Sequence, residues 1–172
     1  MGDNMLKNKY IVAAIIIMIL FLNGCRNQAS EEQVIIETFT LSDLNGQEIL
    51  VDIEKPTILT FVDNIKDEEQ AQISIFRNIY PLVSEEIEFI IIGSFESAKQ
   101  ISTKFEAYKE DGFEPLILND ETGSVIKNYN IKNSPTTLII DREGVIIKRT
   151  TEVLTEDRLL DQIERLLSEQ IA

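Results

Sequence analysis

From Val34 onward, short strand-like runs alternate with amphipathic helical patterns, and this alternation limits the folds open to the chain. Residues 57–62 (TILTFV) and 88–92 (EFIII) are apolar on both faces, which is typical of central strands covered by helices on each side. Further strand patterns occur at 49–53, 116–118, 136–140 and 145–147. The last two are separated by the short turn 141–144, so we expect an antiparallel hairpin there.

Three helical patterns lie between and after these strands. The first begins near Asp67 and places its apolar side chains on one face, although Pro81 is expected to kink or shorten its end. The second covers residues 98–108 and stops before Gly112, and the third starts after the capping residue Thr155. The order β-α-β-α-β, then a hairpin and a helix, predicts an α/β sandwich with a mixed central sheet flanked by helices.

The composition removes most familiar chemistries before any motif is considered. The chain has 172 residues with no His and one Cys, and its formal net charge is −14. A His general base, an intrachain disulfide and a multi-thiolate zinc or copper site are therefore excluded. The acidic surface repels phosphate backbones, so we expect no nucleic-acid partner. No phosphate-binding loop, EF-hand or nucleophile elbow occurs in the sequence, and we expect no cofactor.

Four acidic residues lie close together in the sequence, at Asp63, Asp67, Glu68 and Glu69. Such a cluster could bind calcium, because hard cations take oxygen ligands. Acids in the first turn of a helix also complement the helix dipole without any metal. We favour the second interpretation and expect no metal site.

The start of the chain resembles a bacterial lipoprotein signal peptide. A basic start precedes an uninterrupted apolar run at 10–22, which is shorter than the roughly 20 residues that a bilayer span needs. The run ends in Leu22-Asn23-Gly24-Cys25, which resembles a lipobox. The resemblance implies that a signal peptidase recognises the three residues before Cys25, and that diacylglycerol alkylates the thiol of this new N-terminus. An uncleaved anchor helix with an incidental cysteine is the alternative.

Both alternatives place the rest of the chain outside the cytoplasm, held to membrane lipid through its N-terminus. Residues 26–33 (RNQASEEQ) are polar and predict a flexible tether. On random-coil scaling such a tether spans roughly 15 Å. We therefore expect a signal peptide at 1–24, the lipidated Cys25 with its tether at 25–33, and one domain at 34–172.

A series of segments in this domain carries a family resemblance. The segments are KPTILTF at 55–61, EFIIIGSF at 88–95, YNI at 129–131, SPTTLIID at 134–141 and GVI at 144–146. Their order and spacing are similar to those of extracytoplasmic thioredoxin-like proteins, namely membrane-anchored thiol–disulfide oxidoreductases and the peroxiredoxin-related proteins that share their fold. The resemblance implies a thioredoxin-like three-layer sandwich.

The family's Cys-x-x-Cys motif is missing from this chain. In the family it lies between the first central strand and its helix, where the N–H groups of the helix terminus lower the pKa of a thiol. The aligned positions here are Lys66 and Glu69, and neither side chain can form a disulfide or a sulfenic acid. Cys25 cannot substitute, because lipidation would occupy its sulfur. We therefore expect no thiol catalysis and assign no catalytic residue.

Pro135 matches the family's proline beside the active site, and the resemblance implies that the peptide bond before it is cis. In the family, this proline leaves adjacent backbone groups free to pair with a bound peptide, and Ser134 and Thr136 fit that use. With Asp63 and Asp67 they define the expected groove. A proline that only shapes the turn into a strand is the alternative.

Two functions from different classes follow from these features. The first is a non-catalytic lipoprotein on the outer face of a bacterial membrane, which binds a protein or peptide partner in the groove. The alternative is an oxidoreductase-family or antioxidant-family protein that acts in a redox pathway through the cysteines of a partner. A third possibility, an accessory lipoprotein without a groove function, has no positive support in the sequence.

Overall fold

The computed structural model describes residues 34–63, 65, 67–95, 98–109 and 111–168. They all lie in the second of the two compact units into which the chain divides, Gln33–Ala172. Within the described ranges, no helix combines the length and the apolar character that crossing a bilayer requires. The expected signal peptide, Cys25 and the tether lie outside the described residues.

Seven strands form one mixed sheet in the described part of the chain, in the order β2-β1-β5-β4-β3-β6-β7. The strands are β1 (Phe39–Asp43), β2 (Glu48–Val51), β3 (Thr57–Val62), β4 (Glu88–Gly93), β5 (Leu116–Asn119), β6 (Thr136–Ile140) and β7 (Ile146–Thr150). Strands β3, β4 and β5 run parallel, whereas every other pairing in the sheet is antiparallel. The carboxyl ends of β3, β4 and β5 therefore lie next to one another at one end of the strands.

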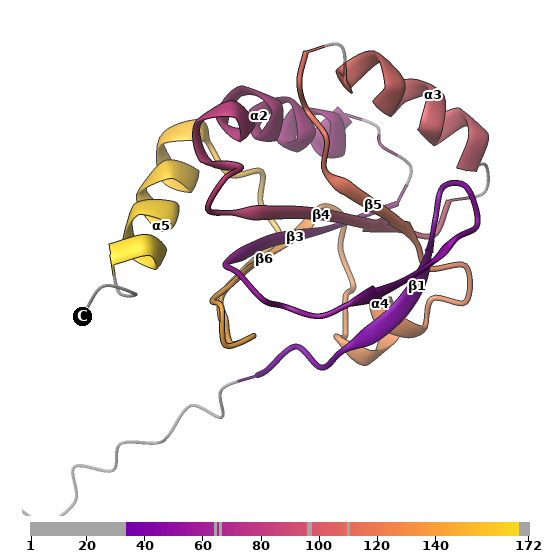
Figure 1. Ribbon diagram of the computed structural model, residues 1–172, viewed down its shortest axis with the longest axis horizontal. Coiled ribbons are helices and arrows are strands. Elements are labelled where there is room, and N and C mark those ends of the chain that lie inside the picture. The colour runs from indigo at the N-terminus through magenta and orange to yellow at the C-terminus, as the bar shows by residue number, and fades with distance from the viewer. Residues whose placement is uncertain (1–33, 64, 66, 96–97, 110, 169–172) are drawn as a thin grey trace, which may run out of the picture. The chain divides into compact units, whose positions relative to one another are not determined.

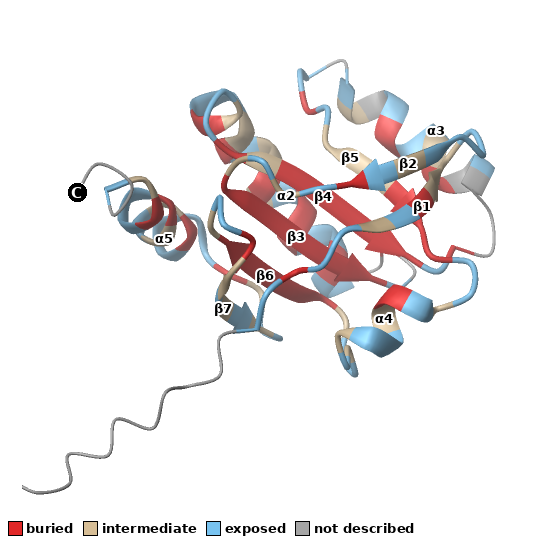
Figure 2. Ribbon diagram, turned by 60° about the horizontal axis from the view of Figure 1, so that its bottom comes forward, coloured by how far each residue is buried: buried red, intermediate tan, exposed pale blue. Residues whose placement is uncertain are grey.

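The central strands β3, β4 and β6 are buried on both faces, as their apolar runs predict (Figure 2). Their side chains alternate between two hydrophobic clusters. Ile58 of β3 and its cross-strand neighbour Ile139 of β6 belong to one cluster. The adjacent pair, Leu59 and Leu138, belongs to the other. The sheet thus separates two cores.

Helices cover both faces of the sheet, which makes three layers (Figure 1). Helices α2 (Asp67–Val83), α3 (Ala98–Lys109) and α5 (Glu156–Ser168) lie on one face, and the short α4 (Ser124–Asn128) lies on the other. Helix α5 buries Leu159, Ile163 and Leu166 against the first core. Its first turn is capped by Thr155, whose Oγ1 accepts a hydrogen bond of 3.4 Å from the Arg158 N–H. The predicted mixed sheet flanked by helices is confirmed.

Two helical features differ from the sequence-based expectation. Helix α2 does not stop at Pro81 but continues to Val83. Pro81 removes only the hydrogen bond that its own N–H would donate. The helical pattern resumes after it, because the Ser84 N–H bonds to the Tyr80 carbonyl at 2.9 Å. Helix α4 was not expected, because five residues are too few to show a helical period.

The ends of two strands also differ. Strand β2 stops at Val51, before the end of the alternating pattern at 49–53. Strand β7 continues to Thr150, well beyond the apolar residues 145–147, because its polar residues pair with β6. The register between these strands shifts between Ile139 and Ile140, directly before the hairpin turn, where Ile147 of β7 is the extra residue. The expected antiparallel hairpin is confirmed.

Candidate functional site

The candidate site lies where β3 ends and α2 begins, beside the carboxyl ends of the parallel strands. Ile65, in the connecting loop, is buried, and its carbonyl oxygen accepts a hydrogen bond of 3.2 Å from Lys104 Nζ of α3. Ile65 and Asp67 have φ angles of 51° and 31°. Positive φ is costly for a residue with a Cβ, and above all for β-branched isoleucine. The buried side chain and the bond from α3 hold this loop in its strained conformation.

Glu69 is the one residue of the acidic first turn of α2 that is buried, while Asp67 and Glu68 are exposed. Its Oε1 accepts a hydrogen bond of 2.6 Å from Ser134 Oγ. The backbone N–H of Asp63 lies 3.0 Å from Ser134 Oγ and 3.3 Å from Glu69 Oε1. These contacts join three segments: the end of β3, the start of α2 and the loop before β6.

The peptide bond between Ser134 and Pro135 is cis, as the family resemblance implies. Pro135 is buried, and Thr136 is only 2% exposed. The hydroxyl of Thr136 turns back into its own loop, where Oγ1 donates a hydrogen bond of 2.6 Å to the Asn133 carbonyl. Ser134 is partly exposed, and the two residues before it, Lys132 and Asn133, are exposed.

A pocket of about 290 Å³ opens directly beside this group. Apolar side chains and polar side chains both line it, and the polar ones include one carboxylate and one ammonium group. The lining residues are Phe61, Val62, Asp63, Ser94, Ile126, Ile131, Lys132, Asn133 and Ser134. The pocket therefore suits an apolar group that ends in, or is flanked by, hydrogen-bonding atoms.

The structure brings together some of the residues that the sequence singles out. Asp63 and Ser134 line the pocket, and Glu69 bonds to Ser134 behind it. Asp67 is exposed at the start of α2. Lys66, like Leu22, Asn23, Gly24 and Cys25, lies outside the described residues. Among the residues that the structure does describe, no three acidic or thiol side chains come together in a way that could hold a metal ion.

Sequence reasoning missed the wall of the pocket that α4 and the following loop provide. Ile126 belongs to α4, and Ile131 and Lys132 follow it. The signal that could have revealed this helix is Asp120, which is fully buried. Its two carboxylate oxygens accept hydrogen bonds of 2.9 Å each from the N–H groups of Ser124 and Ile126. An acid four residues before the first helical residue, Ser124, is a capping pattern that the sequence shows.

The three-layer arrangement, the cis proline and the helix that starts beside it define a thioredoxin-like fold. The fold class expected from the sequence is thus confirmed. Solved structures of this fold include thiol–disulfide oxidoreductases that resemble the chain over most of their length.

Three such structures show how far the likeness extends. The pneumococcal exposed lipoprotein thioredoxin of Streptococcus pneumoniae has a TM-score of 0.61 and 18% identity, over 76% of this chain and 100% of that one. StoA of Bacillus subtilis has a TM-score of 0.61 and 20% identity, over 74% of this chain and 96% of that one. A thiol:disulfide interchange protein DsbE from Chlorobium tepidum has a TM-score of 0.66 and 17% identity, over 80% of this chain and 98% of that one.

No protein-family model and no curated protein matches the chain. At the identities given above, the solved structures establish the fold alone. The chemistry of the site must therefore be argued from this chain's own residues.

Proposed function

We propose that this chain is an extracytoplasmic, lipid-anchored thioredoxin-like protein that binds an extended segment of a protein partner and does not exchange disulfides. The observation that carries the proposal is the hydrogen bond between Ser134 and Glu69. By our alignment Glu69 stands where the family carries the second cysteine of its motif, and here that position holds a carboxyl group that is bonded to the proline loop.

Disulfide exchange requires a thiolate that attacks a sulfur atom. The only cysteine of the chain is Cys25, which precedes the domain by several residues and carries the acyl chains in this proposal. A carboxyl group at position 69 can accept hydrogen bonds but cannot form a mixed disulfide. The group around Glu69 therefore serves to hold the loop that borders the pocket.

The size and lining of the pocket favour a peptide side chain as the occupant. Sites for small molecules usually measure about 300–1,000 Å³. This pocket, at about 290 Å³, lies at the lower end of that range, and a volume of this size also accommodates one or two side chains of a bound segment. Phe61 and Ile131 offer apolar contact, while Asp63 and Lys132 offer groups of both charges to the flanking peptide. Peptide binding near this proline is also what the family resemblance implies.

The lipid anchor rests on the lipobox-like sequence that ends at Cys25. One of the similar solved structures is itself described as an exposed lipoprotein, which supports an anchored, extracytoplasmic location for this chain. Two acyl chains on the N-terminus would anchor it stably, whereas one chain holds only marginally.

A redox assay on the full-length, detergent-solubilised protein separates this proposal from the oxidoreductase alternative. We expect no reduction of insulin by dithiothreitol above the rate without protein. The variant K66C/E69C, which returns a sulfur to both aligned positions, is the positive control, and E69C alone is its matched negative. Turnover by the unsubstituted chain would overturn the non-catalytic function.

Site-specific cross-linking tests the pocket as the binding site. A photoreactive side chain at Lys132, on the pocket wall, is expected to give one discrete product in the membranes of producing cells. The same group at Lys99, an exposed residue of α3, is the control and should give none. Filling the pocket with S94F should abolish the product, whereas S74F on the exposed face of α2 should not. A product that survives S94F would contradict binding in the pocket.

A further inference from the structure

Large apolar side chains are exposed at five positions in the described part of the chain, and three of these lie on one edge of the sheet. Val34 is 52% exposed, Ile35 is 55% exposed and Ile147 is 44% exposed. The other two, Leu50 in β2 and Leu82 in α2, lie on separate elements. Single exposed apolar residues are ordinary on protein surfaces, whereas a group of them marks a site of contact.

The three residues are held together by backbone pairing along the outer side of β7. Ile36 N–H donates to the Gly144 carbonyl at 2.8 Å, and Ile146 N–H donates to the Val34 carbonyl at 2.9 Å. Ile35 forms an antiparallel bridge with Val145 between these two bonds. The first described residues of the domain thus form an isolated bridge beside the end of the hairpin turn and the start of β7. Figure 2 shows them running along this edge of the sheet.

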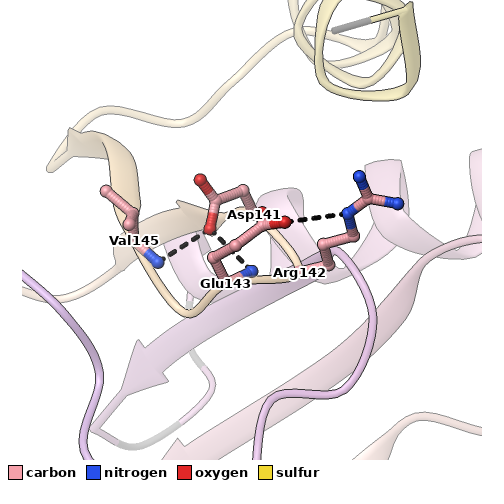
Figure 3. Close-up of polar contacts among 4 residues, drawn as sticks. All are labelled: Asp141, Arg142, Glu143 and Val145. Atoms are coloured by element: carbon pink, nitrogen blue, oxygen red, sulfur yellow. Dashed lines mark hydrogen bonds and ion pairs between the residues drawn. The ribbon is translucent and has the colours of Figure 1, made fainter. Parts of the chain in front are cut away.

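The hairpin turn before β7 is fixed by Asp141 (Figure 3). One oxygen of this carboxylate accepts hydrogen bonds from the N–H groups of Glu143, at 3.0 Å, and Val145, at 2.8 Å. Arg142 Nε lies 2.9 Å from Glu143 Oε1 on the outside of the turn. These bonds hold the backbone of the turn up to Val145, the residue with which Ile35 pairs.

The charges of β7 differ from those of the rest of the molecule. Strand β7 contains Lys148 and Arg149 and no acid, although the whole chain has a net charge of −14. The opposite edge strand, β2, begins with Glu48 and is followed by Asp52, and both are exposed. Exposed Glu143 and Glu152 lie before and after β7, so the attraction to an anionic surface comes from the basic side chains of the strand itself, whereas the β2 edge would be repelled.

The length of the connection to Cys25 limits which surface can face the lipid. Only residues 26–33 separate Cys25 from Val34. Even fully extended, a chain of this length reaches no more than about 30 Å. The edge that starts at Val34 is the part of the domain nearest to that attachment along the chain.

We propose that this surface, named the β7 edge and made up of Val34, Ile35, Ile147, Lys148 and Arg149, rests on the anionic membrane surface that holds the lipidated Cys25. The proposal depends on the lipid anchoring proposed above. The three apolar side chains enter the boundary between headgroups and acyl chains, and Lys148 extends toward the phosphates. Arg149 Nη1 donates a hydrogen bond of 2.9 Å to the Tyr129 carbonyl, so this side chain adds its positive charge from beside the contact. The sheet stands on its β7 edge, and the β2 edge points away from the bilayer.

Spin labels on the full-length protein test this orientation. The variants I147C and I35C, each labelled with a nitroxide at the new thiol, are reconstituted in vesicles that contain phosphatidylglycerol. The matched control is L50C on the opposite edge, where the leucine is 66% exposed. We expect the ratio of collisions with oxygen to collisions with a water-soluble nickel chelate to be several-fold higher at positions 147 and 35 than at position 50. Equal ratios at all three positions would overturn the proposal.

Two further measurements separate the remaining outcomes. Mass spectrometry of the same sample reports whether Cys25 carries acyl chains, and an unacylated Cys25 overturns the anchoring together with this inference. Acylated Cys25 with a water-exposed label at 147 overturns the inference alone. Spin–spin broadening at 147 that grows with the protein-to-lipid ratio would instead reveal contact between copies and would also overturn it.

The charge component has its own variant. K148E is expected to lower the ratio of molecules with the label at 147 in the membrane to molecules with that label in water on the order of tenfold. The reason is that each basic group near an anionic membrane contributes to the attraction. The matched control is K99E, which carries the same charge change on α3. The difference between the two variants should vanish in vesicles of pure phosphatidylcholine. An equal effect of K148E and K99E would contradict a specific role for β7.

Discussion

Ser134 Oγ lies 2.6 Å from Glu69 Oε1, and this hydrogen bond joins the first turn of α2 to the residue before the cis proline. The two residues are 65 positions apart in the sequence. Their contact closes the back of the pocket, because Ser134 also lines it. The geometry of the pocket thus depends on a hydrogen bond between two side chains. Single substitutions at Ser134 and at Glu69 can test it.

Replacement of Ser134 by alanine removes this donor from a buried carboxyl group. We expect S134A to lower the free energy of unfolding by about 1–3 kcal/mol. E69Q should lose less, because its side-chain carbonyl oxygen can still accept the bond from Ser134. Urea denaturation of both variants measures the effect. S74A, on the exposed face of α2, is the control, and an equal loss in S74A would show that the effect does not come from this bond.

Gly93, at the end of β4, has no room for a side chain. A Cβ atom there would lie 2.3 Å from the ring of Phe95 and 2.9 Å from the Val62 carbonyl oxygen. The backbone atom cannot move away cheaply, so we expect G93A to destabilise the fold by about 1–3 kcal/mol. Thermal unfolding measures the loss. S94A, at the exposed neighbouring position, should stay close to the parent, and an unchanged melting temperature for G93A would contradict this crowding.

Two buried threonines pair across the central strands β3 and β6. Thr60 Oγ1 lies 3.1 Å from Thr137 Oγ1, and both residues are essentially inaccessible to solvent. T60V and T137V each leave the other hydroxyl without this partner, whereas the double variant removes both. We therefore expect the double variant to be more stable than the sum of the two losses predicts, by about 0.5–1.5 kcal/mol. Chemical denaturation of the parent, the two single variants and the double variant gives the coupling free energy. Losses in the two single variants that add up to the loss in the double variant would exclude this coupling.

Glu88, the first residue of β4, is half-buried, and burial raises the pKa of its carboxyl group above the usual value of 4.5. Nearby Lys55 opposes this rise and nearby Glu54 adds to it. Between the unfolded and the folded pKa, the folded state binds more protons than the unfolded chain. Stability from this group therefore falls as pH rises through that window, and the loss is complete above the folded pKa.

The test of this pH dependence is E88Q, which removes the charge and keeps the shape of the side chain. We expect E88Q to unfold at a higher temperature than the parent at pH 7, with the difference disappearing below the unfolded pKa. Melting curves of both proteins between about pH 3.5 and about pH 7.5 measure this difference in melting temperature, because the interval begins below the usual pKa of a carboxyl group. The exposed neighbour variant E86Q controls for net charge. A parent protein that is more stable than E88Q at pH 7 would contradict the sign.

Local patterns in the sequence were enough to predict the core strands and the long helices. The runs at 57–62 and 136–140 are apolar on both faces, and they are central strands in the structure. Part of the site could be predicted from the family resemblance, because Ser134 and Pro135 lie in one of the resembling segments and Asp63 follows shortly after another. Helix α4 could not be predicted, since its five residues carry too little periodicity.

By itself, the sequence determined the α/β class and the absence of a second thiol, since periodicity and composition are properties of a single stretch of chain. The tertiary structure decided that Glu69 bonds to Ser134, that α4 forms a wall of the pocket, and that Val34 and Ile35 pair with the start of β7 and the residue before it. The physical reason is that a local pattern shows which face a side chain occupies. Which distant segment packs against that face depends on the strand order and on the burial of the whole sheet.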